Sequence, residues 1–401
     1  MTGQLRGGPL QGVRVVELTK VWAGPYTGKL LAFLGAEVIR IESEKSLDVT
    51  RFYGVDDINK APGFMAVNPQ KLSVQIDMKS KEGINLILDL LRESDVLIEN
   101  LRPGAVKRLG LGYDVVKAVK PDIVYTSMGM YGNEGPLAYQ TGYAPCFAAL
   151  SGLSSLVGYE NQPPAGMNVR YADSTFGAAA ALATVAALFH RRRTGIGQYV
   201  DVSAVESMTS MIGDSLMDYM LNGNIQTGNG NRHPEMAPHG VFPCVDDEWI
   251  SVAASDDAVW HKIAKAMGQP ALAVDERFNT LAKRKLNEDA LNQIITTWTS
   301  RHNAQALATE LQALGIAATM SQSSVDLVAD CHLWSREFYR EVTESTGDTR
   351  SIVGPGWKMS RGATITTGAP RLGEHNAYIF GEILGLSTEE QQKLSAAGIT
   401  R

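Results

Sequence analysis

One carboxylate in the sequence stands where a helix would hold it in place. Asp173 lies in the stretch RYADSTFGAAAALATVAALFHRRRTGIGQ, directly before a long run of small and apolar residues. Asp is a common N-cap, because its side chain accepts hydrogen bonds from the free N–H groups of the first helical turn. Those N–H groups and the helix dipole would also keep the carboxylate ionised, as a nucleophile requires. From the residues alone, Asp173 remains either an N-cap or a nucleophile.

Cationic side chains lie around several of the expected strands. They are Lys20 and Lys29 in TKVWAGPYTGKLLAFLG, Lys71 and Lys79 in NPQKLSVQIDMKSKEG, and Arg102, Lys107 and Arg108 in VLIENLRPGAVKRLGLGYD. Clustered cations after strand ends suit phosphate groups. A solvated helix face explains them about as well, and the chain has neither a dinucleotide G-x-G-x-x-G fingerprint nor a P-loop.

Two further segments could line a site. GMYGNEGPLA, residues 129–138, is a glycine-rich loop that either lets backbone approach a ligand or simply turns a corner. His233 and His239 are six residues apart in a loop, and no carboxylate or cysteine completes a ligand set around them. We therefore expect no metal site.

The elements that would position these residues alternate along the first part of the chain. Val13–Leu18 and Ala36–Glu42 are short apolar runs typical of strands, and a segment between them has leucine and phenylalanine at helical spacing. KEGINLILDLLRES predicts another helix, and DVLIEN and DIVYTSMGMYG predict two more strands. This alternation predicts a doubly wound α/β domain. Further along, strong helix formers over Phe176–Arg193 predict a helix that is buried nearly all round and ends at Gly195.

The composition changes after Leu221, where NGNIQTGNGNRHPEMAPHGVFP is rich in glycine, asparagine and proline. We expect residues 1–223 to form a large α/β domain that contains Asp173 and the cationic segments described above. Residues 224–324 are expected to form a smaller α+β domain, and residues 325–401 to return to the large one.

Composition limits the classes of partner and compartment. The 401 residues carry a net charge of −6, which argues against nucleic-acid binding. The longest apolar runs, such as Phe176–Phe189, are too short to span a bilayer, and the N-terminus lacks a signal-peptide pattern. Three widely spaced cysteines form no disulfide framework. We therefore expect a cytoplasmic protein that binds neither nucleic acid nor a membrane.

Several segments together resemble the class III coenzyme A transferases, the family of the formyl-CoA, carnitine and benzylsuccinate CoA-transferases. The segments begin at LQGVRVVELTKVWAGPYTGKLLAFLGAEVIRIE, include the stretch around Asp173, and end at APRLGEHN. They cover nearly the whole chain in the family's order. The resemblance implies a Rossmann-like large domain, a smaller domain, and two subunits interlocked like links of a chain. It also implies a nucleophilic aspartate, which by position is Asp173.

The resemblance carries over contacts to coenzyme A residue by residue. The matching positions are Lys20, Val21 and Ala23 after the first strand, Ile76 and Lys79 in IDMK, and Asn100, Leu101, Arg108 and Leu109 in ENLRPGAVKRL. Three departures are visible. Ser43 replaces a basic residue that often follows VIRIE, Trp22 replaces a glutamine of formyl-CoA transferase, and that enzyme's glycine-rich lid is missing. Formate and oxalate are therefore not expected as substrates, and Trp22 indicates a larger or more apolar acyl group.

The activity implied is CoA transfer from an acyl-CoA to a carboxylic acid through an aspartyl anhydride and an aspartyl-CoA thioester. The acyl-CoA is a substrate, so no tightly bound cofactor is expected. Succinyl-CoA as donor and an aromatic or branched dicarboxylate such as benzylsuccinate as acceptor are our best candidates. One alternative is an acyl-CoA racemase or isomerase of the same superfamily, although its His-Asp stretch is replaced here by Gly142, Tyr143 and Ala144. Another is a supporting subunit of a hetero-oligomeric transferase, so the assembly is either a homodimer or a hetero-oligomer with a related chain.

Overall fold

The structure, a computed structural model, describes residues 6–166, 170–344 and 347–401, which form two compact units. Unit 1 contains the described residues of 1–154, 166–225 and 332–401, and unit 2 contains 155–165 and 226–331. This division differs from the expected boundaries because residues 155–165 group with unit 2. They are tied there by hydrogen bonds from Gly228 N to Ser155 O and from Gly230 N to Gly158 O, and by an ion pair between Arg232 and Glu160.

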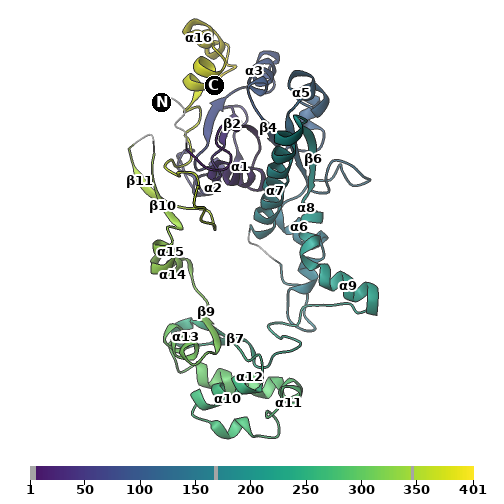
Figure 1. Ribbon diagram of the computed structural model, residues 1–401, viewed down its shortest axis with the longest axis vertical. Coiled ribbons are helices and arrows are strands. Elements are labelled where there is room, and N and C mark those ends of the chain that lie inside the picture. Colours follow the sequence, from purple (N-terminus) through teal and green to yellow (C-terminus); the bar gives the residue numbers. More distant parts are fainter. Residues whose placement is uncertain (1–5, 167–169, 345–346) are drawn as a thin grey trace. The chain divides into compact units, whose positions relative to one another are not determined.

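A six-stranded parallel sheet forms the centre of unit 1, with strand order β3-β2-β1-β4-β5-β6 (Figure 1). The strands are β1 (Arg14–Leu18), β2 (Glu37–Glu42), β3 (Leu72–Gln75), β4 (Val96–Glu99), β5 (Val124–Gly129) and β6 (Gln198–Ser203). This is the order of doubly wound folds, in which the loops after β1 and β4 diverge and leave a crevice at the carboxyl ends of the strands. The predicted α/β class is confirmed.

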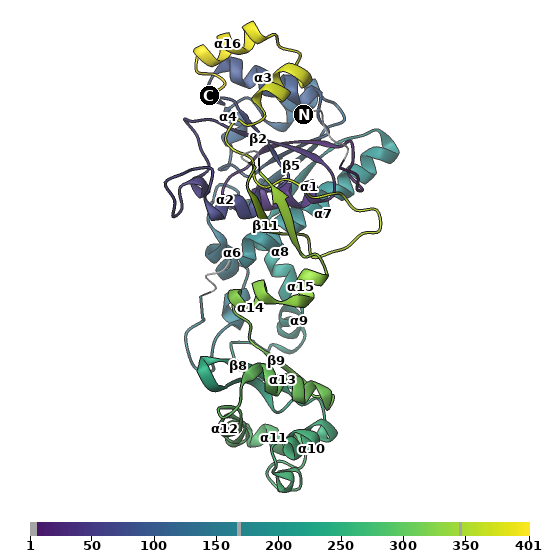
Figure 2. The same cartoon turned by 90° about the vertical axis from the view of Figure 1, so that its left-hand side faces the viewer.

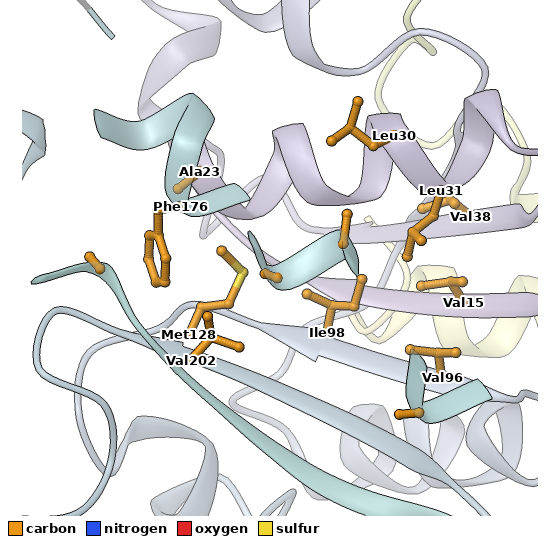
Figure 3. Packing of buried hydrophobic residues seen from close by; sticks show 14 of the residues in the cluster. Val15, Ala23, Leu30, Leu31, Val38, Val96, Ile98, Met128, Phe176 and Val202 are labelled. Carbon is orange, nitrogen blue, oxygen red and sulfur yellow. The ribbon is translucent and has the colours of Figure 1, made fainter. Parts of the chain in front are cut away.

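Helices cover both faces of this sheet. The helices between residues 1 and 225 of unit 1 are α1 (Ala23–Phe33), α2 (Pro62–Val67), α3 (Lys81–Arg92), α4 (Ala105–Arg108), α5 (Tyr113–Val119), α6 (Ala144–Leu150), α7 (Tyr171–Thr194), α8 (Ala204–Thr209) and α9 (Gly213–Asn222). Side chains of α1, α7 and α8 pack on one face, where Leu31, Ile98, Met128 and Phe176 belong to one buried cluster (Figure 3). Side chains of α3 and α5 pack on the other face.

Helix α7 has the predicted C-terminus but a longer N-terminus than predicted. It ends at Gly195, whose φ of 74° is the left-handed conformation that glycine adopts without strain. Arg191, in its last turn, donates to Asp95 and Asp122, so the end of the helix is held by two carboxylates beside the sheet as well as by the helix dipole. Among the described residues, α7 is the one helix long and apolar enough to cross a membrane. It packs against α1, β5 and β6 as a core helix of unit 1.

The prediction that α7 is buried nearly all round is wrong for the single chain. Leu182 and Phe189 are 72% and 62% exposed, respectively. The opposite side of the helix, which includes Ala180, Thr184 and Ala187, is fully buried against the sheet. The helix therefore has one inner face and one face open to solvent.

The C-terminal segment closes one edge of the sheet. It contains α15 (Cys331–Ser335), the hairpin β10 (Tyr339–Thr343) and β11 (Thr349–Val353), a π-helical segment (Tyr378–Ile383) and α16 (Thr388–Ala396). The His375 N–H donates to Ser73 O at 3.0 Å, and the Gln75 N–H donates to Asn376 Oδ1 at 2.8 Å. In both views α16 lies near α3 (Figures 1 and 2). The outer edge of β3 is thus covered by residues about 300 positions away in sequence.

Unit 2 is an antiparallel sheet with helices on one face. Its elements are β7 (His239–Pro243), β8 (Trp249–Ala253), α10 (Asp257–Ala266), α11 (Leu281–Leu286), α12 (Glu288–Thr299), α13 (Ala304–Ala313), β9 (Ala317–Met320) and α14 (Ser324–Ala329). Trp260, Leu291 and Leu311 belong to its core beneath β8. The other face of the sheet lines a cavity of about 520 Å³.

Candidate active site

The loops after β1 and β4 meet where the strand order reverses. Lys20 N donates to Asn100 Oδ1 at 2.7 Å, and Asn100 Nδ2 donates back to Lys20 O at 2.9 Å. One asparagine side chain therefore joins the two loops at the ligand-binding edge of the sheet. The structure places Lys20 and Asn100, both expected to contact coenzyme A, directly beside each other.

Val21 has an unusual backbone conformation in the β1–α1 turn. Its φ of 71° lies in the left-handed region, which a β-branched residue rarely adopts. Its N–H donates to Asp48 Oδ2 at 3.0 Å, and that carboxylate is fully buried and paired with Arg40. A buried ion pair thus fixes the direction of the turn.

Arg40 is the centre of a larger buried charge network beneath the turn. Its guanidinium donates to Glu17 at 2.7 Å and to Glu42 at 3.2 Å, and all three side chains are fully buried. Lys71 donates to Glu17, and Arg51 donates to Glu42. Burial alone would raise the pKa of Glu42, but Arg40 and Arg51 together hold it at about 2. The network therefore stays charged and supports the β1–α1 turn from below.

Asp173 occupies the third position of α7 and not the N-cap. The helix begins at Tyr171, and Arg170 is its N-cap residue. The N-cap interpretation of Asp173 is therefore wrong. Burial raises the pKa of Asp173 to about 6, an effect that the positive charge of Arg170 reduces. A carboxyl with this pKa is still about 90% ionised at pH 7, as a nucleophile requires.

Close packing between α1 and α7 brings Asp173 to the β1–α1 turn. A Cβ at Gly177 would lie 2.7 Å from Ala23 O, so only glycine allows this approach of the two helices. Thr27 Oγ1 donates to Gly177 O at 3.1 Å. One turn earlier, Trp22 Nε1 donates to Ser174 Oγ at 3.3 Å. Asp173 therefore lies next to the loop that contains Lys20, Val21 and Ala23.

The remaining predicted contact positions differ in what they can offer. Ile76 is fully buried in the core, and its N–H donates to Glu42 O, so its carbonyl is the group left for a ligand. The Lys79 and Arg108 side chains are exposed, and Leu101 and Leu109 are partly buried. Near Ser43, which replaces a basic residue, Lys45 provides a half-exposed ammonium 2.8 Å from Asp77. Lys20 Nζ donates to Ser46 Oγ at 2.7 Å.

A polar chain fixes the glycine-rich loop after β5, and the sequence analysis missed it. Glu99, at the end of β4, accepts from Ser127 Oγ, which in turn accepts from Asn133 Nδ2 at 2.9 Å. The Asn133 N–H donates to Asp201 at 2.8 Å. Burial raises the pKa of Glu99 above its usual range. The available signal was a polar residue at or near the end of β4, β5 and β6, because such side chains meet at one edge of the sheet.

His233 and His239 belong to unit 2, with ring centres 5.2 Å apart. His239 Nδ1 is 2.6 Å from Asn231 O. Over residues 6–166, 170–344 and 347–401, no group of three histidine, cysteine or carboxylate side chains is arranged to hold a metal ion.

Comparison with known proteins shows which family has this sequence and fold. The family model described as CoA-transferase family III matches residues 10–376. The chain is 31% identical to succinyl-CoA–D-citramalate CoA-transferase of Chloroflexus aurantiacus, over 99% of both proteins. It is 31% identical to succinate–glutarate CoA-transferase of Agrobacterium fabrum, over 94% of this chain and 96% of that protein.

Two further similarities concern assembly and fold. The chain is 30% identical to the alpha subunit of succinyl-CoA–L-malate CoA-transferase of Chloroflexus aurantiacus, over 98% of this chain and 92% of that protein. A crystal structure of a CAIB/BAIF family protein from Brucella suis superposes with a TM-score of 0.88 at 31% identity, covering 94% of this chain and 100% of that one. The match extends over both units and the sheet that holds Asn100 and the β1–α1 turn, and the chain therefore belongs to the family III, or class III, CoA-transferases.

Proposed function

We propose that this enzyme transfers coenzyme A from succinyl-CoA, or a similar acyl-CoA, to a short aliphatic dicarboxylic acid, with Asp173 as the nucleophile. The observation that carries the proposal is the packing of the Asp173 helix against the β1–α1 turn at the point where the strand order reverses. The relatives reported above are named for transfer to citramalate, glutarate and malate, which supports a dicarboxylate acceptor. No aromatic acid appears among those names, so we favour an aliphatic acceptor over benzylsuccinate.

The first half of the reaction loads coenzyme A onto the enzyme. The Asp173 carboxylate attacks the thioester carbonyl of the donor, and the C–S bond breaks to give a mixed anhydride and the CoA thiolate. The thiolate then attacks the aspartyl carbonyl of the anhydride. The donor acid leaves as its carboxylate, and coenzyme A remains on Asp173 as a thioester.

The second half of the reaction transfers coenzyme A from Asp173 to the acceptor by the same steps in reverse. The acceptor carboxylate attacks the aspartyl thioester, which forms a new anhydride and expels the thiolate. The thiolate attacks the acyl carbonyl of the acceptor, giving the product thioester and free Asp173. Each attack passes through a tetrahedral oxyanion. Backbone N–H groups in the first turn of α7 lack helical partners and can donate to such an anion, as can those of the 129–135 loop.

The ionisation state of Asp173 suits both halves of the reaction. With its pKa at about 6, the carboxylate is ionised at neutral pH and is less strongly solvated than an exposed one. The β1–α1 turn faces Asp173 across the site. The buried charge network beneath Val21 and the hydrogen bonds of Asn100 hold this turn in a fixed position.

The test is to trap the intermediate on Asp173. Wild-type protein is incubated with succinyl-CoA and then hydroxylamine, and the peptide containing residue 173 is analysed by mass spectrometry. We expect a hydroxamate on Asp173, and no transfer by Asp173→Ala. Asp114→Ala, which removes an exposed carboxylate from α5, serves as the matched control and keeps full turnover. Normal turnover by the Asp173 variant would refute the assignment.

We also infer that a second chain, identical or related, covers part of unit 1. Helix α9 has no buried residue, and Met220, Leu221 and Ile225 are each more than 70% exposed. Together with the open face of α7, this apolar surface supports the interlocked pair expected for the family. Light scattering should give about twice the 43.3 kDa mass of one chain. A monomer at micromolar concentration would argue against the pairing.

A further inference from the structure

Arg170 stands at the entrance to the Asp173 helix and is held by an aromatic ring. It is the residue before α7 begins, three positions before Asp173, and it is exposed. Its guanidinium carbon lies 4.3 Å from the centre of the Trp22 ring. Because the Trp22 N–H donates to Ser174 Oγ, the ring is anchored to the same helix turn. A cation–π contact of this kind fixes the plane of a guanidinium while leaving its N–H edges free to donate.

The positive charge of Arg170 faces the Trp22 ring and Asp173. Within the described part of the chain, no ion pair is made by Arg170, whereas Arg14, Arg40, Arg51, Arg191 and Arg232 all have carboxylate partners. Its electrostatic effect falls on Asp173, the group proposed to react. An oriented and unpaired guanidinium beside the nucleophile is suited to bind an anionic group of the substrate.

The spacing fits a second carboxylate of the acid. Arg170 is the N-cap residue of α7 and Asp173 is the third residue of the helix, and the positive charge of Arg170 acts on the Asp173 carboxyl. The two side chains therefore approach the same small volume. The two carboxyl carbons of an extended four-carbon diacid are separated by three bonds, about 3.8 Å, as consecutive Cα atoms are. A diacid with one carboxyl at Asp173 therefore brings its other carboxyl within reach of the guanidinium.

We propose that Arg170, oriented by Trp22, binds the distal carboxylate of the acid and selects dicarboxylates over monocarboxylates. This inference rests on the proposed function and deepens it, because it assigns the choice of acid to one side chain. It also changes the role of Trp22. The sequence indicated that Trp22 favours a larger or more apolar acyl group, whereas one face of its ring supports a cation.

The experiment compares acids that differ in one carboxylate. Values of kcat/KM are measured at pH 8 for succinate against butyrate and for glutarate against valerate, at saturating donor. The variants are Arg170→Gln and Arg170→Lys, with Arg192→Gln, an exposed arginine at the far end of α7, as the matched control. We expect Arg170→Gln to lower the dicarboxylate-to-monocarboxylate preference about 10- to 100-fold, the loss typical of hydrogen bonds between charged groups. Arg170→Lys should restore part of it, and the control should leave it unchanged.

Two results would overturn the proposal. An equal loss for both series of acids would mean that Arg170 only positions Asp173. A raised KM for every acyl-CoA, with the preference unchanged, would mean that it contacts the coenzyme. Failure of the proposed function appears separately, in the wild-type enzyme, as no preference for diacids or no hydroxamate on Asp173.

Discussion

Replacing Asp173 with asparagine should make the protein inactive but more stable. The carboxyl has an ordinary pKa of 3.8, and burial raises it to about 6, so the folded state disfavours the charged form. Each pKa unit of such a shift corresponds to about 1.4 kcal/mol. The charged side chain therefore lowers the free energy of unfolding by up to about 3 kcal/mol above pH 7. This value is a ceiling, because Asp173 is partly exposed and solvent screens its charge. Asparagine has nearly the same shape and never carries the charge.

The sign of the pH dependence makes the test specific. A carboxyl whose pKa rises on folding lowers stability in full above the folded pKa, and the cost disappears as the pH falls towards the unfolded value. The advantage of Asp173→Asn should therefore be at most about 3 kcal/mol at pH 7.5 and about half as large at pH 5. Urea unfolding of both proteins at equal concentration, followed by circular dichroism, measures this difference directly. Asp114→Asn, at an exposed position, should change stability by less than about 0.5 kcal/mol at either pH.

The reasoning fails if the variant is less stable than the wild type at pH 7.5. It also fails if the gain is the same at both pH values, because the effect would then arise from packing and not from charge.

Three other predictions concern the site and its support. The kcat/KM of the wild type should fall about tenfold for each pH unit below 6, as Asp173 becomes protonated, and a flat profile from pH 5 to 8 would contradict this. Lys29 is buried without a carboxylate partner in the described chain, and burial lowers its pKa to about 8. Below that pH the folded protein carries the charge in a buried site, so Lys29→Met should raise the free energy of unfolding at pH 7 by up to about 3 kcal/mol. The gain should shrink towards pH 10.5 in denaturation curves. Asn100→Ala removes both hydrogen bonds between the β1 and β4 loops and should weaken CoA binding about tenfold in calorimetry, whereas Asn303→Ala in unit 2 should leave it unchanged.

The sequence was informative where local signals determine structure. The alternation of apolar runs predicted the parallel sheet, and Gly195 correctly marked the end of α7. The start of α7 was wrong, because Asp is a common cap and nothing local indicates that Arg170 takes that position. The buried network had a visible signal, since Glu17 and Arg40 interrupt strands that are otherwise apolar, and charges in strands covered on both faces must be paired.

The contacts that shape the site could not be predicted in this way. Trp22 and Ser174 are 152 positions apart, and Gly177 meets Ala23 through the crossing of two helices. Such contacts depend on how elements pack and not on local propensity. The exposed face of α7 illustrates a second limit of sequence-based prediction. An alanine-rich run predicts a buried helix, but it does not show whether the helix is buried by its own chain or by another chain.

The way in which the chain divides between its two units has a consequence for synthesis. Unit 1 needs residues 332–401, because the outer edge of β3 is paired only when His375 and Asn376 have arrived. Unit 2 is complete once residue 331 has left the ribosome. On a ribosome that adds about 5–20 residues per second, β3 therefore waits with an open edge for about 15–60 seconds after it emerges. The unit that carries Asp173 is the last to finish folding, so a chain that is cut short leaves the outer edge of β3 uncovered.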